Sequence, residues 1–256
     1  MLRDLTKEDW LSILNLPEHR IPKVLILRGT RNLKTQYQRY HGYFSNVTEI
    51  TPTNGLLEDI FVAELSGVPI GYASVYGAPM ASEVVHVFGV LGTSLVLHTG
   101  CCGALAPDIR TGDLFICIEA YCGDGASSCY KPGRKKIVRA SFNACQLPSI
   151  QKANDITLHL GRIYTTSALF AEGRKQVEDW FRKGCLAADM ETSAVFAVAE
   201  HFQMDRLAIL YVFDNPRYEG DIIISNCQKN KNRAFADKRM IELTLDIAKM
   251  YCKEKK

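Results

Sequence analysis

The sequence predicts a single α/β domain, and three observations support this prediction. Short apolar runs typical of strands alternate with helix-like stretches along the chain. The 256 residues are 47% hydrophobic, a share that suits one large core. The sequence contains no internal repeat, low-complexity tract or linker-like stretch. We therefore expect one domain over residues 1–256, with its core at about 20–251.

The first half of the chain predicts mainly strands. Strands are expected where β-branched and other apolar residues run together between turn residues. Residues 60–65 and 68–76, for example, lie on either side of a Ser66-Gly67 turn. The elements expected here, in order, are strands at 23–27, 60–65 and 68–76, a helix at 82–91, and strands at 94–99 and 113–120.

The second half predicts more helix. Residues 132–150 have no sustained periodicity and predict a long loop. The most strand-like segment of the chain is the apolar run at 207–213, and the last helix is amphipathic. The elements expected here, in order, are a strand at 161–166, helices at 175–183 and 188–202, a strand at 207–213 and a helix at 238–251.

Composition and charge exclude several classes of protein. The net charge of +3 and the lack of a basic stripe interleaved with aromatics argue against a nucleic-acid partner. A basic cluster at 131–139 is interpreted as a solvated loop. No apolar run approaches the roughly 20 residues that span a bilayer, and the N-terminus lacks a signal peptide. The nine cysteines show no CxxC pair or zinc spacing. We therefore expect a soluble, cytoplasmic protein with no metal and no membrane partner.

Three of the predicted strands end in polar or glycine-containing sequences. These endings are Arg28-Gly29-Thr30-Arg31, His98-Thr99-Gly100 and Asp214-Asn215. Ligands of open α/β sheets collect beyond the carboxyl ends of the strands. The three endings are therefore expected to lie near one another and to form a binding site.

Two carboxylates are candidates for chemistry. Asp214 follows seven apolar residues. Partial desolvation at this position would raise the pKa of its carboxyl group and let it act as an acid. Alternatively, Asp214 caps the Asp-Asn-Pro-Arg turn. Glu191 begins an Ala- and Val-rich helix, where small neighbours imply burial and a need for a partner such as a sugar diol. Asp189 is better explained by the helix dipole.

The glycine turn that continues the second strand ending is a weaker signal. Gly100-Cys101-Cys102-Gly103 would let backbone amides approach an anion or a planar base. A thiol nucleophile at Cys101 is not favoured, because no His-Asn or His-Asp arrangement is nearby. His98 is typical of a hydrogen-bonded core histidine. Leu169 and Phe170 fit either a base-stacking pair or ordinary core.

Three motifs, in this order, resemble the nucleoside phosphorylase and nucleosidase family, which includes purine nucleoside phosphorylase, uridine phosphorylase and methylthioadenosine nucleosidase. Residues 99–113 are similar to the family's glycine turn and the strand entry after it, and 189–195 to its E-M-E-x-A-A helix start. Phe213-Asp214-Asn215 is similar to the S-D-N turn of purine-acting members. The resemblance implies a three-layer fold with a central mixed, partly barrel-like sheet flanked by helices.

The resemblance also implies the reaction, which is cleavage of the N-glycosidic bond of a purine nucleoside. Asp214 would protonate N7 of the departing base, while Glu191 and the backbone of Met190 would hold the ribose hydroxyls. Uridine-acting relatives lack the aspartate, so purine is favoured. The other substrate contacts that the resemblance implies are Met80, Leu169, Phe170, Cys102 and Gly103.

The residues that would bind the attacking group depart from the family pattern. Leu33, flanked by Lys34, stands where phosphorylases carry an arginine, and His98 replaces a second one. A third arginine, lent by a neighbouring subunit from about residues 46–60, has no counterpart here, and Cys101 replaces a hydroxyl residue. The glutamate of the water-using relatives is missing as well.

A basic cluster without a general base favours an anionic nucleophile, so we expect phosphorolysis, with inorganic phosphate as co-substrate and no other cofactor. A hydrolytic nucleosidase and an inactive nucleoside-binding protein are the alternatives. We also expect a homo-oligomer, with apolar surface from Tyr72, Tyr76 and Phe88. Arg28 could join the anion site, whose expected members are Gly29, Arg31, Lys34, His98 and Cys101.

Overall fold

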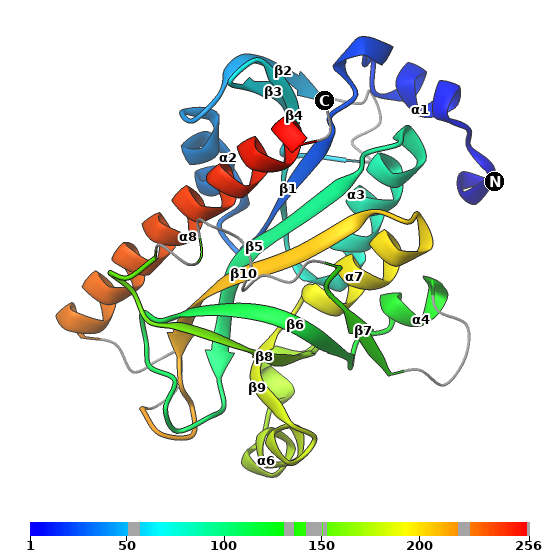
Figure 1. Ribbon diagram of the computed structural model, residues 1–256. Helices are drawn as coiled ribbons and strands as arrows, with labels where there is room; N and C mark the ends of the chain where they lie inside the picture. Colours follow the sequence, from blue (N-terminus) through cyan, green and yellow to red (C-terminus); the bar gives the residue numbers. More distant parts are fainter. Residues whose placement is uncertain (51–56, 131–135, 142–149, 151–152, 220–225, 255–256) are drawn as a thin grey trace.

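The computed structural model describes residues 1–50, 57–130, 136–141, 150, 153–219 and 226–254. Its centre is a mixed sheet that curls into a partial barrel, with helices on both sides (Figure 1). The strands are β1 (Val24–Gly29), β2 (Ser45–Ile50), β3 (Ile60–Leu65), β4 (Val68–Val75), β5 (Leu95–Ala104), β6 (Leu114–Cys122), β7 (Ile137–Arg139), β8 (Leu158–Thr165), β9 (Cys185–Asp189) and β10 (Asp205–Asp214).

Helices cover both faces of this sheet. α8 and α2 lie on one side, and α3 and α7 pack together on the other (Figure 1). The α-helices are α1 (Lys7–Ile13), α2 (Leu33–His41), α3 (Gly77–Leu91), α4 (Ala126–Tyr130), α6 (Arg174–Arg182), α7 (Thr192–His201) and α8 (Cys227–Glu254). None of the helices in the described part of the chain is both long and apolar enough to cross a membrane.

The partial barrel arises from the way β5 and β10 pair. The sheet order is β10-β6-β8-β9-β5-β1-β4-β3-β2, and β10 also pairs with β5, which closes the first five strands into a ring. β1, β5 and β10 run parallel to one another. This confirms the expected three-layer α/β fold with a mixed, partly barrel-like sheet.

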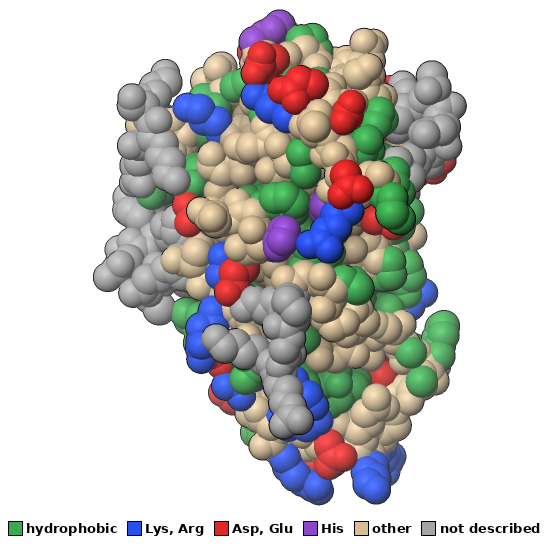
Figure 2. Space-filling model, turned by 90° about the vertical axis from the view of Figure 1, so that its right-hand side faces the viewer, with side chains coloured by type: hydrophobic (Ala, Val, Ile, Leu, Met, Phe, Trp, Pro, Cys, Tyr) green, Lys and Arg blue, Asp and Glu red, His purple; other side chains and the backbone are tan. Residues whose placement is uncertain are grey.

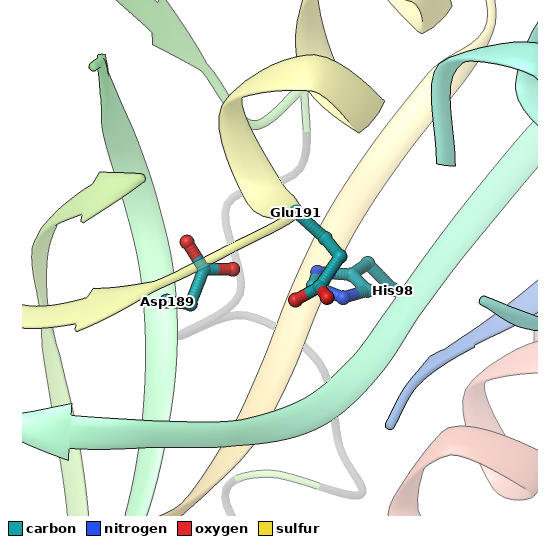
Figure 3. Close-up of side chains that lie close together, drawn as sticks. All are labelled: His98, Asp189 and Glu191. Carbon is teal, nitrogen blue, oxygen red and sulfur yellow. The ribbon is translucent and has the colours of Figure 1, made fainter. Parts of the chain in front are cut away.

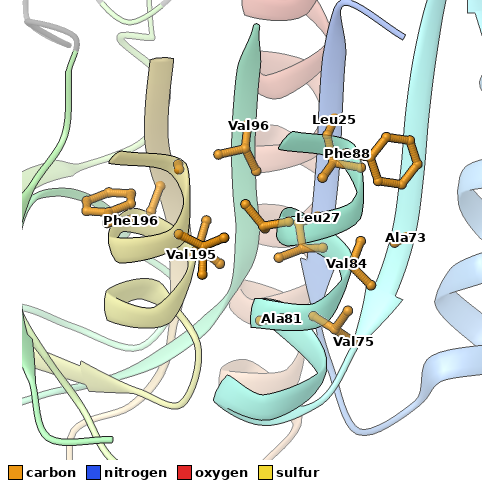
Figure 4. Close-up of a cluster of buried hydrophobic side chains, with 14 of the residues drawn as sticks. Leu25, Leu27, Ala73, Val75, Ala81, Val84, Phe88, Val96, Val195 and Phe196 are labelled. Atoms are coloured by element: carbon orange, nitrogen blue, oxygen red, sulfur yellow. The ribbon is translucent and has the colours of Figure 1, made fainter. Parts of the chain in front are cut away.

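Two apolar layers hold the helices to the sheet, because side chains alternate between its faces. In β1, Leu25 and Leu27 pack toward α3 and α7, whereas Val24 and Ile26 pack toward α8. Figure 4 shows the first layer, in which Phe88 of α3 lies near the strand side chains. Burial of such aliphatic side chains contributes about 1.5–3 kcal/mol each.

Two expectations about the fold were wrong. The helix expected at 188–202 begins only at Thr192, because residues 185–189 form β9 between β5 and β8. The short run Leu186-Ala-Ala188 has no strong strand preference and takes its conformation from these neighbours. Residues 137–139 form β7 inside the expected 132–150 loop, of which 132–135 and 142–149 lie outside the described residues.

The apolar surface expected from Tyr72 and Phe88 is also a wrong expectation, since both side chains are fully buried. Tyr72 stacks on Tyr40 and Phe61, with ring centroids 4.4 and 4.9 Å apart.

On the face shown in Figure 2, acidic and basic side chains are interspersed rather than gathered into one patch of a single sign.

Candidate active site

The carboxyl ends of β1, β5 and β10 meet at one edge of the sheet. In the parallel register, Arg28 of β1 is opposite Thr99 of β5, and Asp214 of β10 is opposite Gly103. Gly100 has no side chain, and a Cβ there would lie only 3.1 Å from the Gly29 carbonyl oxygen. The three polar strand endings therefore lie together, as the sequence predicted.

Glu191 is the N-cap residue of α7, and it is 6% exposed. Its Oε1 accepts a hydrogen bond of 2.7 Å from the backbone N–H of Gly77, the first residue of α3. Gly77 has a φ of 80°, which glycine adopts without a steric penalty. Burial, and next the charge of Asp189, raise the pKa of Glu191 to about 8. The carboxyl group therefore holds its proton near neutral pH.

His98 of β5 lies beside Glu191 (Figure 3). Both side chains converge on Gly29, where a Cβ would be 2.9 Å from Glu191 Oε2 and 3.0 Å from His98 Nε2. Gly29 is therefore needed at the end of β1 because any side chain would collide with this pair. Burial, and next the neighbouring Arg28, lower the pKa of His98 to about 3, so the imidazole is neutral.

Asp189, the last residue of β9, completes a cluster in which one ring nitrogen of His98 and one carboxyl oxygen each of Asp189 and Glu191 lie within 4.8 Å of one another. Its two oxygens accept hydrogen bonds from the hydroxyls of Thr165 and Thr192 and from the Thr192 backbone N–H. Asp189 is thus held by protein donors at the junction of β9 and α7, and it caps the helix after the strand.

Asp214 lies on the other side of β5, at the end of β10. Its Oδ1 would be 3.0 Å from a Cβ on Gly103, so the glycine gives the carboxylate its room. The next residue, Asn215, is fully buried and donates from Nδ2 to the carbonyls of Ala106 and Ile109, at 2.8 and 2.9 Å. The Asn215 side chain therefore anchors the turn that presents Asp214.

Glu172 is a residue of this region that the sequence interpretation missed. It follows a short 3-10 helix at Leu169–Ala171 and is partly buried. Burial, and next the charge of nearby Asp214, raise the pKa of Glu172 to about 7. A single glutamate in a loop carries no sequence signal of this kind, because only the fold brings it close to Asp214.

The predicted basic residues take three different positions. The Arg31 guanidinium lies 4.7 Å from the Tyr76 ring centroid and 5.6 Å from that of Phe170, whose side chain is 92% exposed. Arg28 is buried and donates to Asp237 at 2.8 Å, so it is not available to the proposed anion site. Lys34 is exposed and lines a cavity of about 620 Å³ that contains none of the other predicted site residues.

The glycine turn places its two cysteines differently. Cys101 is accessible to solvent although it lies inside a central strand, so it faces an open space. Surrounding protein, and to a smaller degree Glu191 and Asp214, raise the pKa of its thiol to about 11. Cys102 is buried. Met80, Met190 and Leu169 are partly buried.

Residues 25–238 of the chain match the Phosphorylase superfamily. A guanosine phosphorylase from Halorubrum lacusprofundi is 30% identical over 139 residues, which are 54% of this chain and 58% of that protein. A DeoD-type purine nucleoside phosphorylase from Geobacillus kaustophilus is 25% identical over 184 residues, which are 72% of each chain.

Solved structures show the same fold. A uridine phosphorylase from Vibrio fischeri ES114 superposes with a TM-score of 0.73 at 22% identity, covering 89% of this chain and 92% of that one. The same enzyme complexed with 6-hydroxy-1-naphthoic acid gives a TM-score of 0.75 at 21% identity, covering 92% of this chain and 95% of that one. With the match over 25–238, these findings show that the chain belongs to the phosphorylase superfamily, as a member of the nucleoside phosphorylase family.

Proposed function

We propose that this protein cleaves the N-glycosidic bond of purine nucleosides by phosphorolysis, releasing the free base and a sugar 1-phosphate. The observation that supports this most directly is the position of two carboxyl groups beside β5. Glu191 lies at the Gly29 end of the site, and Asp214 lies against Gly103. A nucleoside bound between them would present its sugar to Glu191 and its base to Asp214.

Asp214 is the proposed general acid. Cleavage leaves an oxocarbenium-like sugar and a base that gains negative charge, so protonation of the base is where a positioned acid lowers the barrier most. Glu172 supports this role as a second carboxyl group near Asp214, because its pKa of about 7 lets it carry a proton beside the base near neutral pH. The match to guanosine and DeoD-type purine nucleoside phosphorylases supports a purine substrate.

Glu191 and the Met190 backbone are proposed to bind the sugar hydroxyls. The carboxyl is oriented by the Gly77 N–H and is 6% exposed, so it offers its remaining acceptor positions from a largely desolvated place. Leu169 and Phe170 follow β8 in a 3-10 helix close to Arg31 and Glu172. We propose that they contact the base, while Met80 of α3, Cys102 and Gly103 line the pocket.

The phosphate is proposed to bind at the Gly29 end of the site, where Arg31 supplies the positive charge. Arg31 is exposed and is held by two aromatic rings, so its guanidinium donors remain available to an anion. Gly29, His98 and Cys101 would form the surrounding wall. Lys34, which lies on α2, would contribute through its charge.

The test is to incubate the protein with inosine, guanosine, adenosine and uridine, with and without phosphate, and to identify the sugar product. We expect sugar 1-phosphate from the purine nucleosides only when phosphate is present, and less of it in Arg31→Ala. Free ribose formed at equal rates in both conditions would instead show a hydrolase. Cleavage of uridine as fast as the purine nucleosides would overturn the assignment of a purine substrate. If no nucleoside releases its base, the enzymatic proposal is rejected in favour of a nucleoside-binding protein.

A further inference from the structure

His98 belongs to the wall of the proposed phosphate site, but in the described part of the chain its buried Nε2 atom has no partner that this role explains. The side chain is 1% exposed, and its Nε2 has no hydrogen-bond partner among the described residues. Its other nitrogen, Nδ1, is 3.0 Å from the Thr192 hydroxyl oxygen. A buried polar atom without a partner costs stability, so its surroundings indicate what it serves.

The hydrogen bonds behind His98 determine which nitrogen carries the proton. Thr165 Oγ1 accepts from the Ser193 N–H at 2.9 Å and donates its own hydrogen to Asp189. The backbone N–H and the hydroxyl of Thr192 also point at Asp189. All three donors are directed at the Asp189 carboxyl group, which is therefore the acceptor in these hydrogen bonds; they oppose the rise in its pKa that burial causes.

The Thr192 hydrogen is therefore used on Asp189, and its oxygen can only accept from His98. This fixes His98 as the tautomer with the hydrogen on Nδ1, which leaves a lone pair on Nε2. That lone pair lies beside Gly29, where the Oε2 atom of Glu191 also lies. The buried acceptor of His98 is thus opposite a carboxyl group that carries its proton at neutral pH.

We propose that Asp189, Thr192 and His98 form a hydrogen-bonded chain that positions Glu191, with His98 Nε2 accepting the hydrogen of the Glu191 carboxyl. In this arrangement Oε2 donates to Nε2, while Oε1 keeps its hydrogen bond from the Gly77 N–H. Both carboxyl oxygens are then fixed, and their free lone pairs face the ligand. His98 and Thr192 are positioning residues in this scheme, because they act on the sugar only through Glu191.

The inference rests on the proposed function for the identity of the ligand, and it deepens that function by naming what orients the sugar-binding group. A fixed Glu191 distinguishes a ribose from a sugar that lacks a hydroxyl, because hydrogen-bond discrimination depends on the geometry of the acceptor. A loosely held Glu191 would adapt to either sugar. The ratio of kcat/KM for inosine to that for 2′-deoxyinosine therefore reports on the chain.

The experiment uses two substitutions of Thr192. Thr192→Val keeps the shape of the side chain and removes the hydroxyl, whereas Thr192→Ser keeps the hydroxyl. Thr244→Val, which removes another buried hydroxyl in α8, is the matched control. We expect Thr192→Val to lower the ratio about tenfold, mainly through a higher KM for inosine. Thr192→Ser and Thr244→Val should keep the ratio of the parent protein.

Nitrogen-15 NMR of the His98 ring gives a second readout that needs no activity. The parent protein and Thr192→Ser should show the hydrogen on Nδ1, and Thr192→Val should not. A hydrogen on Nε2 in the parent overturns the inference, as does an unchanged ratio in Thr192→Val. If the parent cleaves no nucleoside, the proposed function fails and the NMR result still decides whether the chain exists. Normal cleavage with an unaffected ratio would remove the inference and leave the function in place.

Discussion

Glu191→Gln should change how the stability of the protein depends on pH. Burial raises the pKa of Glu191 from its usual 4.5 to about 8, so the folded protein holds a proton that the unfolded chain has lost between these values. The contribution of this group is fully present below pH 4.5 and is lost as the pH rises through 8. At 1.36 kcal/mol per pKa unit, the whole loss is on the order of 5 kcal/mol.

Glutamine is the appropriate replacement because it is neutral at every pH and has nearly the shape of a protonated glutamate. Its oxygen can accept from the Gly77 N–H as Oε1 does. The parent and the variant should therefore be about equally stable at and below about pH 4.5, where Glu191 is protonated in both the folded and the unfolded chain. The difference should then grow in favour of the variant by about 1.4 kcal/mol for each pH unit up to about pH 7.5.

Urea unfolding at half-unit steps from pH 5.5 to 8.5 measures this difference, since ordinary titrations common to both proteins cancel. Glu172→Gln serves as the control, because its carboxyl is less buried and its pKa is lower, at about 7. Parallel stability curves for the parent and Glu191→Gln across this range would refute the conclusion that Glu191 is neutral in the folded protein.

Four other predictions concern the site and the assembly. Asp214→Asn should lower turnover on purine nucleosides at least a hundredfold while nucleoside binding, measured by calorimetry, is retained; near-normal turnover would exclude Asp214 as the acid. Glu172→Gln should change the pH dependence of kcat/KM near pH 7, because it removes a carboxyl group with a pKa of about 7 beside the proposed acid; an unchanged profile would show that Glu172 does not affect the reaction. Gly29→Ala should destabilise the protein by about 1–3 kcal/mol in urea unfolding, since its Cβ would be 2.9 Å from Glu191 Oε2, and an unaffected midpoint would contradict this close packing. Light scattering should show a dimer or larger homo-oligomer, and a monomer at working concentration would refute this proposal.

Much of the fold could be predicted because its strands are strongly apolar. The runs at 23–27 and 207–213 have few polar residues, so burial on both faces is their only stable arrangement. α2 and β2 were not predicted, because their sequences are largely polar and their side chains are mostly exposed or half-buried. β9 was missed for a different reason, since five residues with a short alanine run have no periodicity of their own.

The sequence by itself determined that Asp214 and Glu191 are the carboxylates to consider, because each is next to a long apolar or small-residue run that limits where it can lie. Only the tertiary structure could show what surrounds them. Thr192 and His98 are 94 residues apart in the chain, and the fold brings Glu172 close enough to Asp214 for the charge of one to act on the other. Hydrogen bonds and pKa values depend on distances of a few ångströms between distant segments, and such distances exist only after the chain has folded.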